Sequence, residues 1–219
     1  MPTLSSTHPT LIILAGIMFA LSFFIVTRIR LRPMLALFSW QSVLLALFIG
    51  ASAQQTGEVQ LLIIGTATLL LKAWLVPQLL RQVSLRSRAS QRLLTIIRPE
   101  ITMLLSVGVV AIGFLLARSI TIESVPSYPI VGIAISTVSL GLLMLITHKN
   151  MFGQIIGFLL MENGIFVLGL TLVGGLPLLI ELGIFFDIAV GAILMAGISY
   201  QVQQTHQTIL TNSLEELVD

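Results

Sequence analysis

The sequence predicts an all-α, polytopic integral membrane protein with about seven transmembrane helices, its N-terminus outside and its C-terminus in the cytoplasm. Of its 219 residues, 56% are hydrophobic and only 9% are charged, whereas soluble domains carry about a quarter charged residues. The mean hydropathy is +1.05. The apolar residues also form blocks that approach or exceed the roughly 20 residues that a membrane-crossing helix needs.

Seven apolar stretches can be drawn, each separated from the next by turn or polar residues. They cover residues 10–27, 34–53, 59–80, 101–117, 128–147, 151–173 and 176–200. The first two breaks read RIRLRP and QQTGE, and the last break ends at Pro177, which suits the first turn of a helix. No basic residue precedes the first stretch and no small-residue cleavage site follows it, so we expect it to be retained as a helix.

The positions of the basic residues support the count of seven. With seven spans, the odd-numbered loops lie on one side of the membrane and hold most of the 11 Lys and Arg residues. These are Arg28, Arg30, Arg32, Arg81, Arg86, Arg88, Arg92, Arg98 and Lys149. The positive-inside rule then places the odd-numbered loops in the cytoplasm. We therefore interpret the basic clusters as topology signals and expect no nucleic-acid partner.

The segment 81–98 contains arginines but no acidic residue, which leaves two interpretations. It could be a docking surface for an acidic partner, or an interfacial helix on anionic lipid headgroups, and the lipid interpretation is favoured. The tail 201–219 is polar and ends with acidic residues. We expect a short cytoplasmic helix or strap there.

Metal and redox chemistry have few candidate ligands in this chain. Cysteine is absent, which excludes disulfides, cysteine-ligated iron–sulfur clusters and thioether-bound haem. The three histidines are His8, His148 and His206, and no two of them have the spacing of ligands on one helix. We expect no metal, no cofactor and no catalytic centre in this chain.

Three ionisable residues, Lys72, Glu162 and Asp187, lie near the middle of predicted spans. At 1.5 Å per helical residue, each lies within about one or two turns of the bilayer midplane. A charge there is costly, so each side chain should face the protein interior or a hydrated cavity. One interpretation is a proton or ion path; the other is a static salt bridge between Lys72 and one of the two acids.

Four further residues are candidates for supporting roles. Pro77 should free the carbonyl of the residue four positions earlier and bend the helix just past Lys72, or it is a tolerated membrane proline. Asn163 is expected to support Glu162, and packing is the favoured role for Gln41. Glu181 falls in the first turn of the last span, where a carboxylate suits the helix dipole.

The chain divides into three predicted parts. Residues 1–98 form a three-helix membrane unit with an arginine-rich cytoplasmic loop, 99–127 a linking transmembrane helix, and 128–219 a second three-helix unit with a cytoplasmic tail. The two three-helix units share an outline and an orientation, which would make them a parallel repeat.

The motif MENG at 161–164, with ELGI at 181–184 and Asp187, resembles hydrogenase-4 component E, a membrane subunit of formate-hydrogenlyase-type complexes. The resemblance extends over essentially the whole chain. It includes Gln41 with Ser42, Lys72 with the Val-Pro pair at 76–77, and the tail residues Thr205, His206 and Asn212.

The half from 128 to 219 also looks like the K subunit of respiratory complex I and the C subunit of multisubunit cation/proton antiporters. Lys149 and Asn150 match the basic-Asn pair of that pattern, and Asp187 matches its second membrane glutamate. Leu159 stands where the pattern has its first glutamate, and Glu162 follows one turn later on much the same face.

The resemblance implies a multi-pass subunit in the cytoplasmic membrane of a bacterium or archaeon. Its implied partners are antiporter-like membrane subunits, a quinone-site-like membrane subunit and a peripheral hydrogenase arm, within the lipid bilayer. The implied function is a non-catalytic share of proton or cation translocation through Lys72, Glu162 and Asp187, coupled to redox chemistry elsewhere. The alternatives are a structural scaffold between antiporter-like subunits, or a subunit of a stand-alone cation/proton antiporter.

Overall fold

The computed structural model describes residues 9–86, 95–120, 128–173 and 183, and every element in these ranges is a helix. The elements are α1 (Pro9–Thr27), α2 (Leu31–Thr56), α3 (Val59–Thr68), the π-helix η1 (Leu69–Leu75), α4 (Val76–Arg86), α5 (Pro99–Ile120), α6 (Tyr128–Thr147) and α7 (Met151–Val173). Because α3, η1 and α4 follow one another without a break, they form one span. The predicted all-α class is therefore confirmed.

Six of these helical spans are long and apolar enough to cross a membrane. They correspond to the first six predicted spans. The predicted seventh span, residues 176–200, lies outside the described residues. The helices α6 and α7 have the predicted bounds, whereas α1, α2, the third span and α5 are each longer than predicted.

The second span starts earlier than predicted, because α2 begins at Leu31 and includes Pro33 in its first turn. A proline is tolerated there, since the N–H it lacks would have no partner within the helix. The third span continues beyond residue 80 to Arg86, so the first part of the arginine-rich segment extends a membrane helix. Gly57 ends α2 with a φ of 73°, and its N–H donates to the carbonyl of Ala53.

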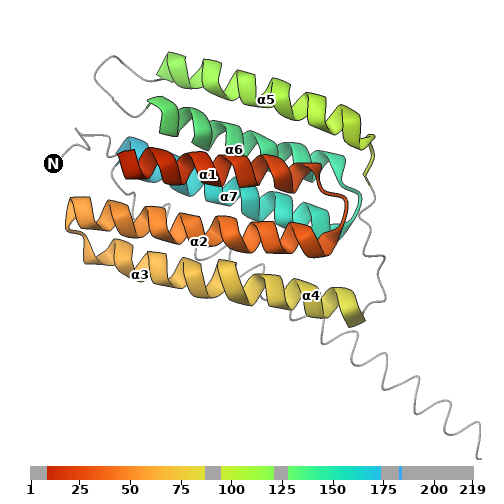
Figure 1. Ribbon diagram of the computed structural model, residues 1–219, viewed down its shortest axis with the longest axis horizontal. Coiled ribbons are helices and arrows are strands. Elements are labelled where there is room, and N and C mark those ends of the chain that lie inside the picture. The colour runs from red at the N-terminus through yellow and green to blue at the C-terminus, as the bar shows by residue number, and fades with distance from the viewer. Residues whose placement is uncertain (1–8, 87–94, 121–127, 174–182, 184–219) are drawn as a thin grey trace, which may run out of the picture.

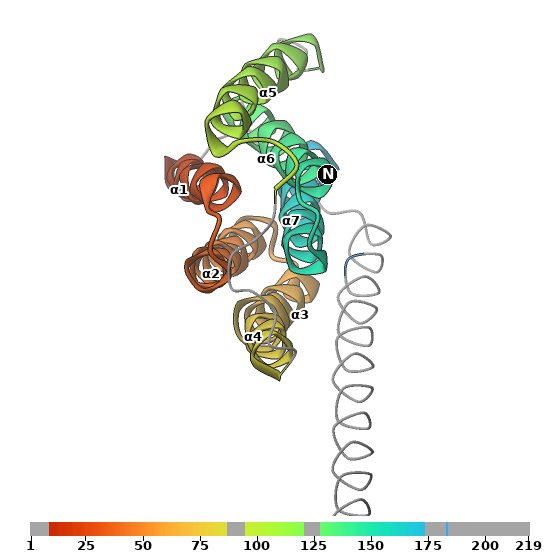
Figure 2. The ribbon, with the colours of Figure 1, turned by 90° about the vertical axis from the view of Figure 1, so that its right-hand side faces the viewer.

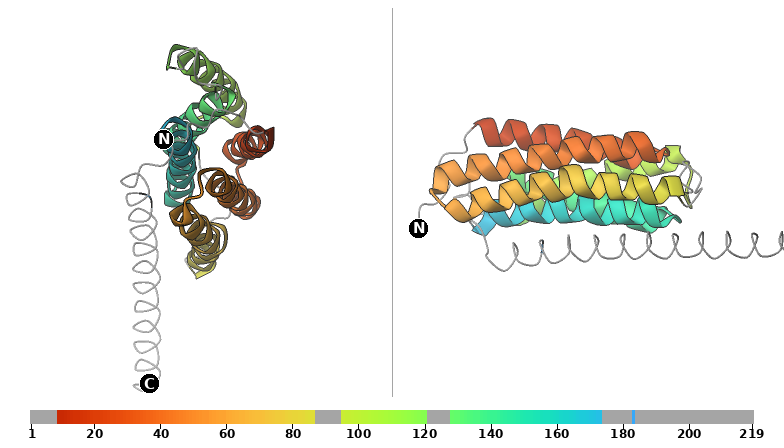
Figure 3. Two further views of the ribbon diagram at one scale, coloured as in Figure 1. Left: turned by 90° about the vertical axis from the view of Figure 1, so that its left-hand side faces the viewer. Right: turned by 90° about the horizontal axis from the view of Figure 1, so that it is seen from below.

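The helices form two rows that run along a common direction (Figure 1, Figure 2). One row contains α5, α6 and α7, and the other contains α1, α2 and the span α3–η1–α4. The rows contact each other through α1 with α6 and through α2 with α7. Both end-on views in Figures 2 and 3 show that α5 lies at one edge, beside α6.

Positive charge is concentrated at one end of the bundle. The last turns of α1, α4 and α6 and the first turns of α2, α5 and α7 lie at this end, and the last turns of α2 and α5 and the first turns of α3 and α6 lie at the opposite end (Figure 1). Among the described residues, Arg28, Arg30, Arg32, Arg81, Arg86, Arg98 and Lys149 belong to the first end, and Arg118 belongs to the opposite end. This segregation is the one that the positive-inside rule requires of a membrane bundle.

Two apolar cores lie one after the other along the bundle. The core near the basic end includes Phe38, Leu80 and Met144, and the core toward the other end includes Phe48 and Leu61. The outward faces are also apolar: Trp40 is 66% exposed and Leu104 is 73% exposed. A soluble protein would aggregate through such faces, whereas lipid tails can cover them.

Candidate functional site

A buried ion pair joins the third and sixth described spans at their centres. The Nζ of Lys72 lies 2.9 Å from Oε1 of Glu162, and the two side chains are 0% and 5% exposed. Lys72 is the central residue of the span Val59–Leu85, and Glu162 is one of the two central residues of Met151–Leu172. The pair therefore lies at the middle of its spans, which is the depth in a membrane where an unpaired charge is most costly.

A chain of hydrogen bonds runs from Lys72 across the bundle. Its Nζ also donates to Oδ1 of Asn163 at 3.3 Å. The amide of Asn163 donates to Oε1 of Gln41 at 3.5 Å, and the amide of Gln41 donates to the hydroxyl of Ser22 at 2.7 Å. The Ser22 hydroxyl ends the chain by donating to the carbonyl of Met18 at 2.8 Å. Each group donates to the next, so the chain is polarised in one direction away from the ammonium group.

This chain forms a polar layer between the two apolar cores. The side chains of Lys72, Asn163, Gln41 and Ser22 are all fully buried. They come from η1, α7, α2 and α1, so four helices are tied together at one level of the bundle. Buried polar groups are tolerated when hydrogen-bonded, and in a low dielectric such bonds strengthen one another.

Lys72 lies within the π-helix η1, where the backbone is wider than in an α-helix. The N–H of Val76 donates to the carbonyl of Leu71, five residues earlier, which is the π pattern. The irregularity therefore surrounds Lys72, whereas the sequence analysis placed a bend just after it. A widened turn ahead of Pro77 gives its ring room against the preceding turn, which an α-helical turn would crowd.

Glu162 and Asn163 are positioned by the tight packing of α7 on α6. A Cβ added at Gly141 would lie 2.5 Å from the backbone nitrogen of Met161, and one at Gly164 would lie 2.7 Å from that of Val138. Contacts this short show that the two backbones touch, which only glycine permits. The helix that carries the carboxylate is therefore held rigidly on both sides of residue 162.

Two further residues close around the ion pair. The ring centroid of Phe166 lies 5.1 Å from Nζ of Lys72, which is within cation–π distance. A Cβ at Gly183 would clash with the ring of Phe166 and lie 3.3 Å from Oε1 of Glu162. Gly183 therefore packs directly against the site. Asp187 and Glu181 lie outside the described residues, so their part in the site stays a prediction.

Four residues predicted as candidates from the sequence lie together in the structure: Lys72, Glu162, Asn163 and Gln41. Two further residues of the site, Ser22 and Phe166, were not predicted. A serine in an apolar span and a phenylalanine one turn after an acid are too common to signal a site. For Gln41, packing was the favoured role, but the structure places its amide in the hydrogen-bond chain.

The geometry allows an ammonium and a carboxylate to exchange a proton or to switch each other's charge. The amides of Asn163 and Gln41 have no titratable proton, so they orient Lys72 and do not relay protons themselves. In the ranges that the structure describes, no three metal-ligating side chains gather.

Comparison with known proteins relates the chain to one characterised component. Hydrogenase-4 component E of Escherichia coli is 27% identical over 206 residues, which cover 93% of this chain and 95% of the relative. The same component of Shigella flexneri matches equally. An uncharacterized protein of Mycobacterium tuberculosis is 26% identical over 213 residues, 94% of each chain.

No family model and no solved structure matches the chain. The resemblance to the K subunit of complex I and the antiporter C subunit therefore stays a prediction. The first resemblance is confirmed: along nearly its whole length, this membrane protein is a relative of hydrogenase-4 component E.

Proposed function

We propose that this chain is a non-catalytic membrane subunit of a hydrogenase-type complex, in which it carries part of a proton or cation path. The relatives named as a hydrogenase component support membership of such a complex. The path would run through Lys72 and Glu162, with Asp187 as a third group. Redox chemistry would take place in other subunits.

The observation that carries the proposal is the ion pair of Lys72 and Glu162 at mid-span. A buried ion pair is weak evidence for stability, because apolar residues of similar volume often stabilise a core as well or better. An ionisable pair at the centre of a membrane bundle is therefore a functional candidate by default. Its place beside a π-helix adds support, since π-helical turns occur frequently at functional sites.

The partners in this proposal are antiporter-like membrane subunits, a quinone-site-like membrane subunit and a peripheral hydrogenase arm. The same ion pair would also serve a purely structural scaffold, because it fixes α7 against the third span. A third possibility is a subunit of a stand-alone cation/proton antiporter. Hydrogenase genes beside the gene for this chain would favour the first proposal, and antiporter genes alone would favour the third.

The substitution Glu162→Gln separates a path from a scaffold. Glutamine keeps an acceptor for the ammonium of Lys72 but cannot titrate. We expect complexes that contain this subunit in normal amount but have lost most of their redox-driven proton uptake in inverted vesicles. Glu58→Gln is the matched control, because Glu58 is exposed at the end of a span. Loss of the subunit from the complex with Glu162→Gln would favour the scaffold, and normal uptake would contradict the path.

A further inference from the structure

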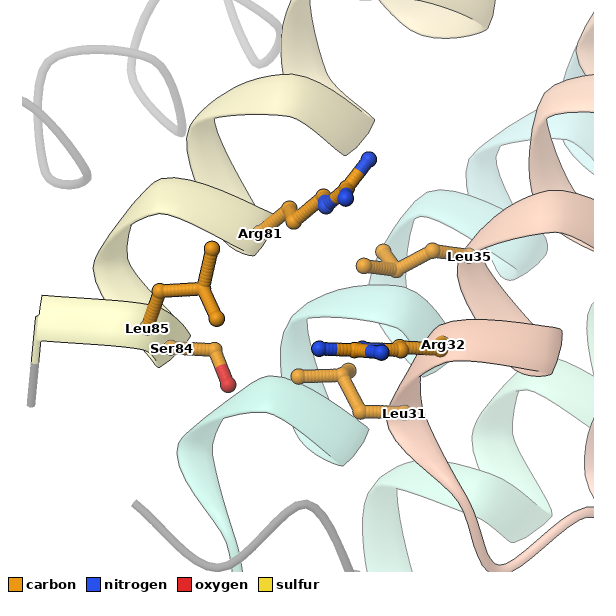
Figure 4. Close-up of a pocket in the computed structure, with 6 residues that line it drawn as sticks. All are labelled: Leu31, Arg32, Leu35, Arg81, Ser84 and Leu85. Atoms are coloured by element: carbon orange, nitrogen blue, oxygen red, sulfur yellow. The ribbon is translucent and has the colours of Figure 1, made fainter. Parts of the chain in front are cut away.

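A groove lined by two arginines opens between the first turns of α2 and the last turns of α4, at the basic end of the bundle. Its lining residues are Leu31, Arg32, Leu35, Arg81, Ser84 and Leu85 (Figure 4). Figure 4 shows Arg32 reaching from α2 toward α4, and Arg81 reaching from α4 toward α2. The two guanidinium groups therefore project into the same gap from opposite walls.

Both arginines are exposed, and they lack acidic partners in the described part of the chain. The ion pair found there is the one between Lys72 of η1 and Glu162 of α7, at the middle of the bundle. Two cations that line one groove without an acidic partner give it a positive potential. The arrangement therefore favours a bound anion, and a planar guanidinium fork suits phosphate oxygens in particular.

The start of α2 lies at the same end of the bundle as the groove. The helix begins at Leu31, and the N–H groups of Leu31 and Arg32 have no carbonyl partner within the helix, whereas Pro33 has no N–H. Backbone N–H groups and the helix dipole at such an N-terminus favour a negatively charged group. The helix start and the two arginines are independent features, and both select an anion.

Apart from Ser84, the remaining lining residues are apolar, and they face two environments. Leu31 and Leu35 are buried and form the inner wall, whereas Leu85 is 53% exposed at the rim. The open space amounts to about 220 Å³ with its mouth included. Much of this space is open to the surroundings, so a phosphate group would rest at the mouth of the groove against the two arginines, and acyl chains would not enter it. The chains would lie outside, along the exposed apolar faces of the helices.

We propose that this groove binds the phosphate of an anionic phospholipid headgroup from the leaflet at the basic end of the bundle. Arg32 and Arg81 hold the phosphate from two helices, and Leu85 contacts the upper part of an acyl chain. A lipid is favoured over an acidic protein surface because the groove has an apolar rim and lies where membrane helices meet the headgroup layer. The inference is independent of the ion path at the centre of the bundle.

The test measures lipid binding to the full-length protein, purified in a mild detergent and delipidated. Phosphatidylglycerol is titrated in mixed micelles, with phosphatidylcholine as the neutral reference, and bound lipid is counted by native mass spectrometry. The double variant Arg32→Gln with Arg81→Gln should bind phosphatidylglycerol about 30-fold more weakly, at roughly fivefold per arginine. The charge-conserving double variant Arg32→Lys with Arg81→Lys should retain most of the binding.

The matched control is Arg28→Gln with Arg98→Gln, which removes the same charge from the same end but not from the groove. We expect it to bind nearly as wild type. Equal binding by the groove variant and this control would overturn the proposal. So would stabilisation of the delipidated protein by inorganic phosphate alone, or loss of a partner subunit from the complex with unchanged lipid binding.

Discussion

The ammonium group of Lys72 is held by side chains of α7. Lys72 itself lies in the wide π-helical turns of η1. Glu162 supplies the counter-charge, Asn163 a hydrogen bond and Phe166 the face of a ring. These three residues lie within two turns of α7, so a small rotation of that helix would move all of them together. The position of the Lys72 ammonium group and the position of α7 are therefore physically coupled.

A second buried titratable group, His148, follows the end of α6. Its side chain is 1% exposed, and its Nδ1 lies 3.0 Å from the carbonyl of Met144. Burial lowers the pKa of His148 below its usual value of 6.5, although the hydrogen bond to the Met144 carbonyl opposes this shift. Because the unfolded chain then binds a proton more readily than the folded one, this residue destabilises the fold as the pH falls below about 6.5.

We predict that His148→Asn flattens the acid side of the stability profile. Asparagine keeps a donor for the Met144 carbonyl but does not titrate in this range. The wild type should lose more stability than the variant below pH 6.5, by at most about 1.4 kcal/mol per pH unit between the pKa values of the unfolded and the folded chain. The measurement is the thermal midpoint in detergent from pH 8 to pH 5.5, with Lys149→Gln as the exposed neighbouring control. Parallel profiles for wild type and His148→Asn would rule out this role.

The depth of the candidate residues could be predicted from the sequence, but their pairing could not. Counting residues from the ends of a span places Lys72 and Glu162 at the midplane. Whether Lys72 meets Glu162 or Asp187 depends on which helices are neighbours and how each is rotated. Those relations come from long-range packing, which a single sequence does not display. The structure pairs Lys72 with Glu162, and the position of Asp187 stays a prediction.

At the scale of elements, the long apolar stretches determined the six described spans, and local chemistry determined their ends. The span 128–147 was predicted with the bounds that α6 has, because polar or turn residues flank it closely. The π-helix was not predicted. A proline predicts an irregular helical turn before it, but whether the helix bends or widens there depends on the helices packed against it.

The packing of α6 on α7 predicts a strong difference between two glycines. Gly141→Ala places a methyl group 2.6 Å from the carbonyl oxygen of Gly157, so the backbones must separate. We expect a loss of roughly 1–3 kcal/mol of stability, the usual cost of overpacking. In the control Gly16→Ala, nothing lies within 4 Å of the added carbon. That variant should be neutral or slightly stabilised by helix propensity.

Thermal midpoints of the two purified variants in the same detergent provide the comparison. Because Gly141 contacts the backbone beside Glu162, Gly141→Ala should also lower redox-driven proton uptake in complexes that still assemble. A Gly141→Ala protein as stable as Gly16→Ala would show that α6 and α7 do not pack as closely as described.

At the scale of the whole molecule, the basic end defines the topology. The described helices carry the chain across the membrane six times, so the end of α7 returns to the side of the N-terminus. The predicted seventh span would bring the C-terminus to the basic, cytoplasmic side. Reporters that are active only in the cytoplasm should therefore be silent after Gly57 and after Ser124, and active after Arg88 and at the C-terminus.

A reporter after Gly174 gives the sharpest reading of this topology, because it follows α7 directly. It should be silent while the C-terminal reporter is active. A silent C-terminal reporter would contradict the seventh span.

The segregation of basic residues was predicted from the sequence because it requires only the order of spans and loops. The arrangement of the helices in two rows required the structure.

The most direct test of an ion path through Lys72 and Glu162 replaces this ion pair by apolar residues, in the double variant Lys72→Met with Glu162→Leu. Such a swap is often tolerated structurally, whereas removing one partner of a buried pair costs roughly 3–5 kcal/mol. Subunit content by native gel and redox-driven proton uptake by inverted vesicles are measured on the same preparations. An ion path through this pair predicts complexes that assemble normally and take up few or no protons. Assembled complexes with undiminished proton uptake would contradict it.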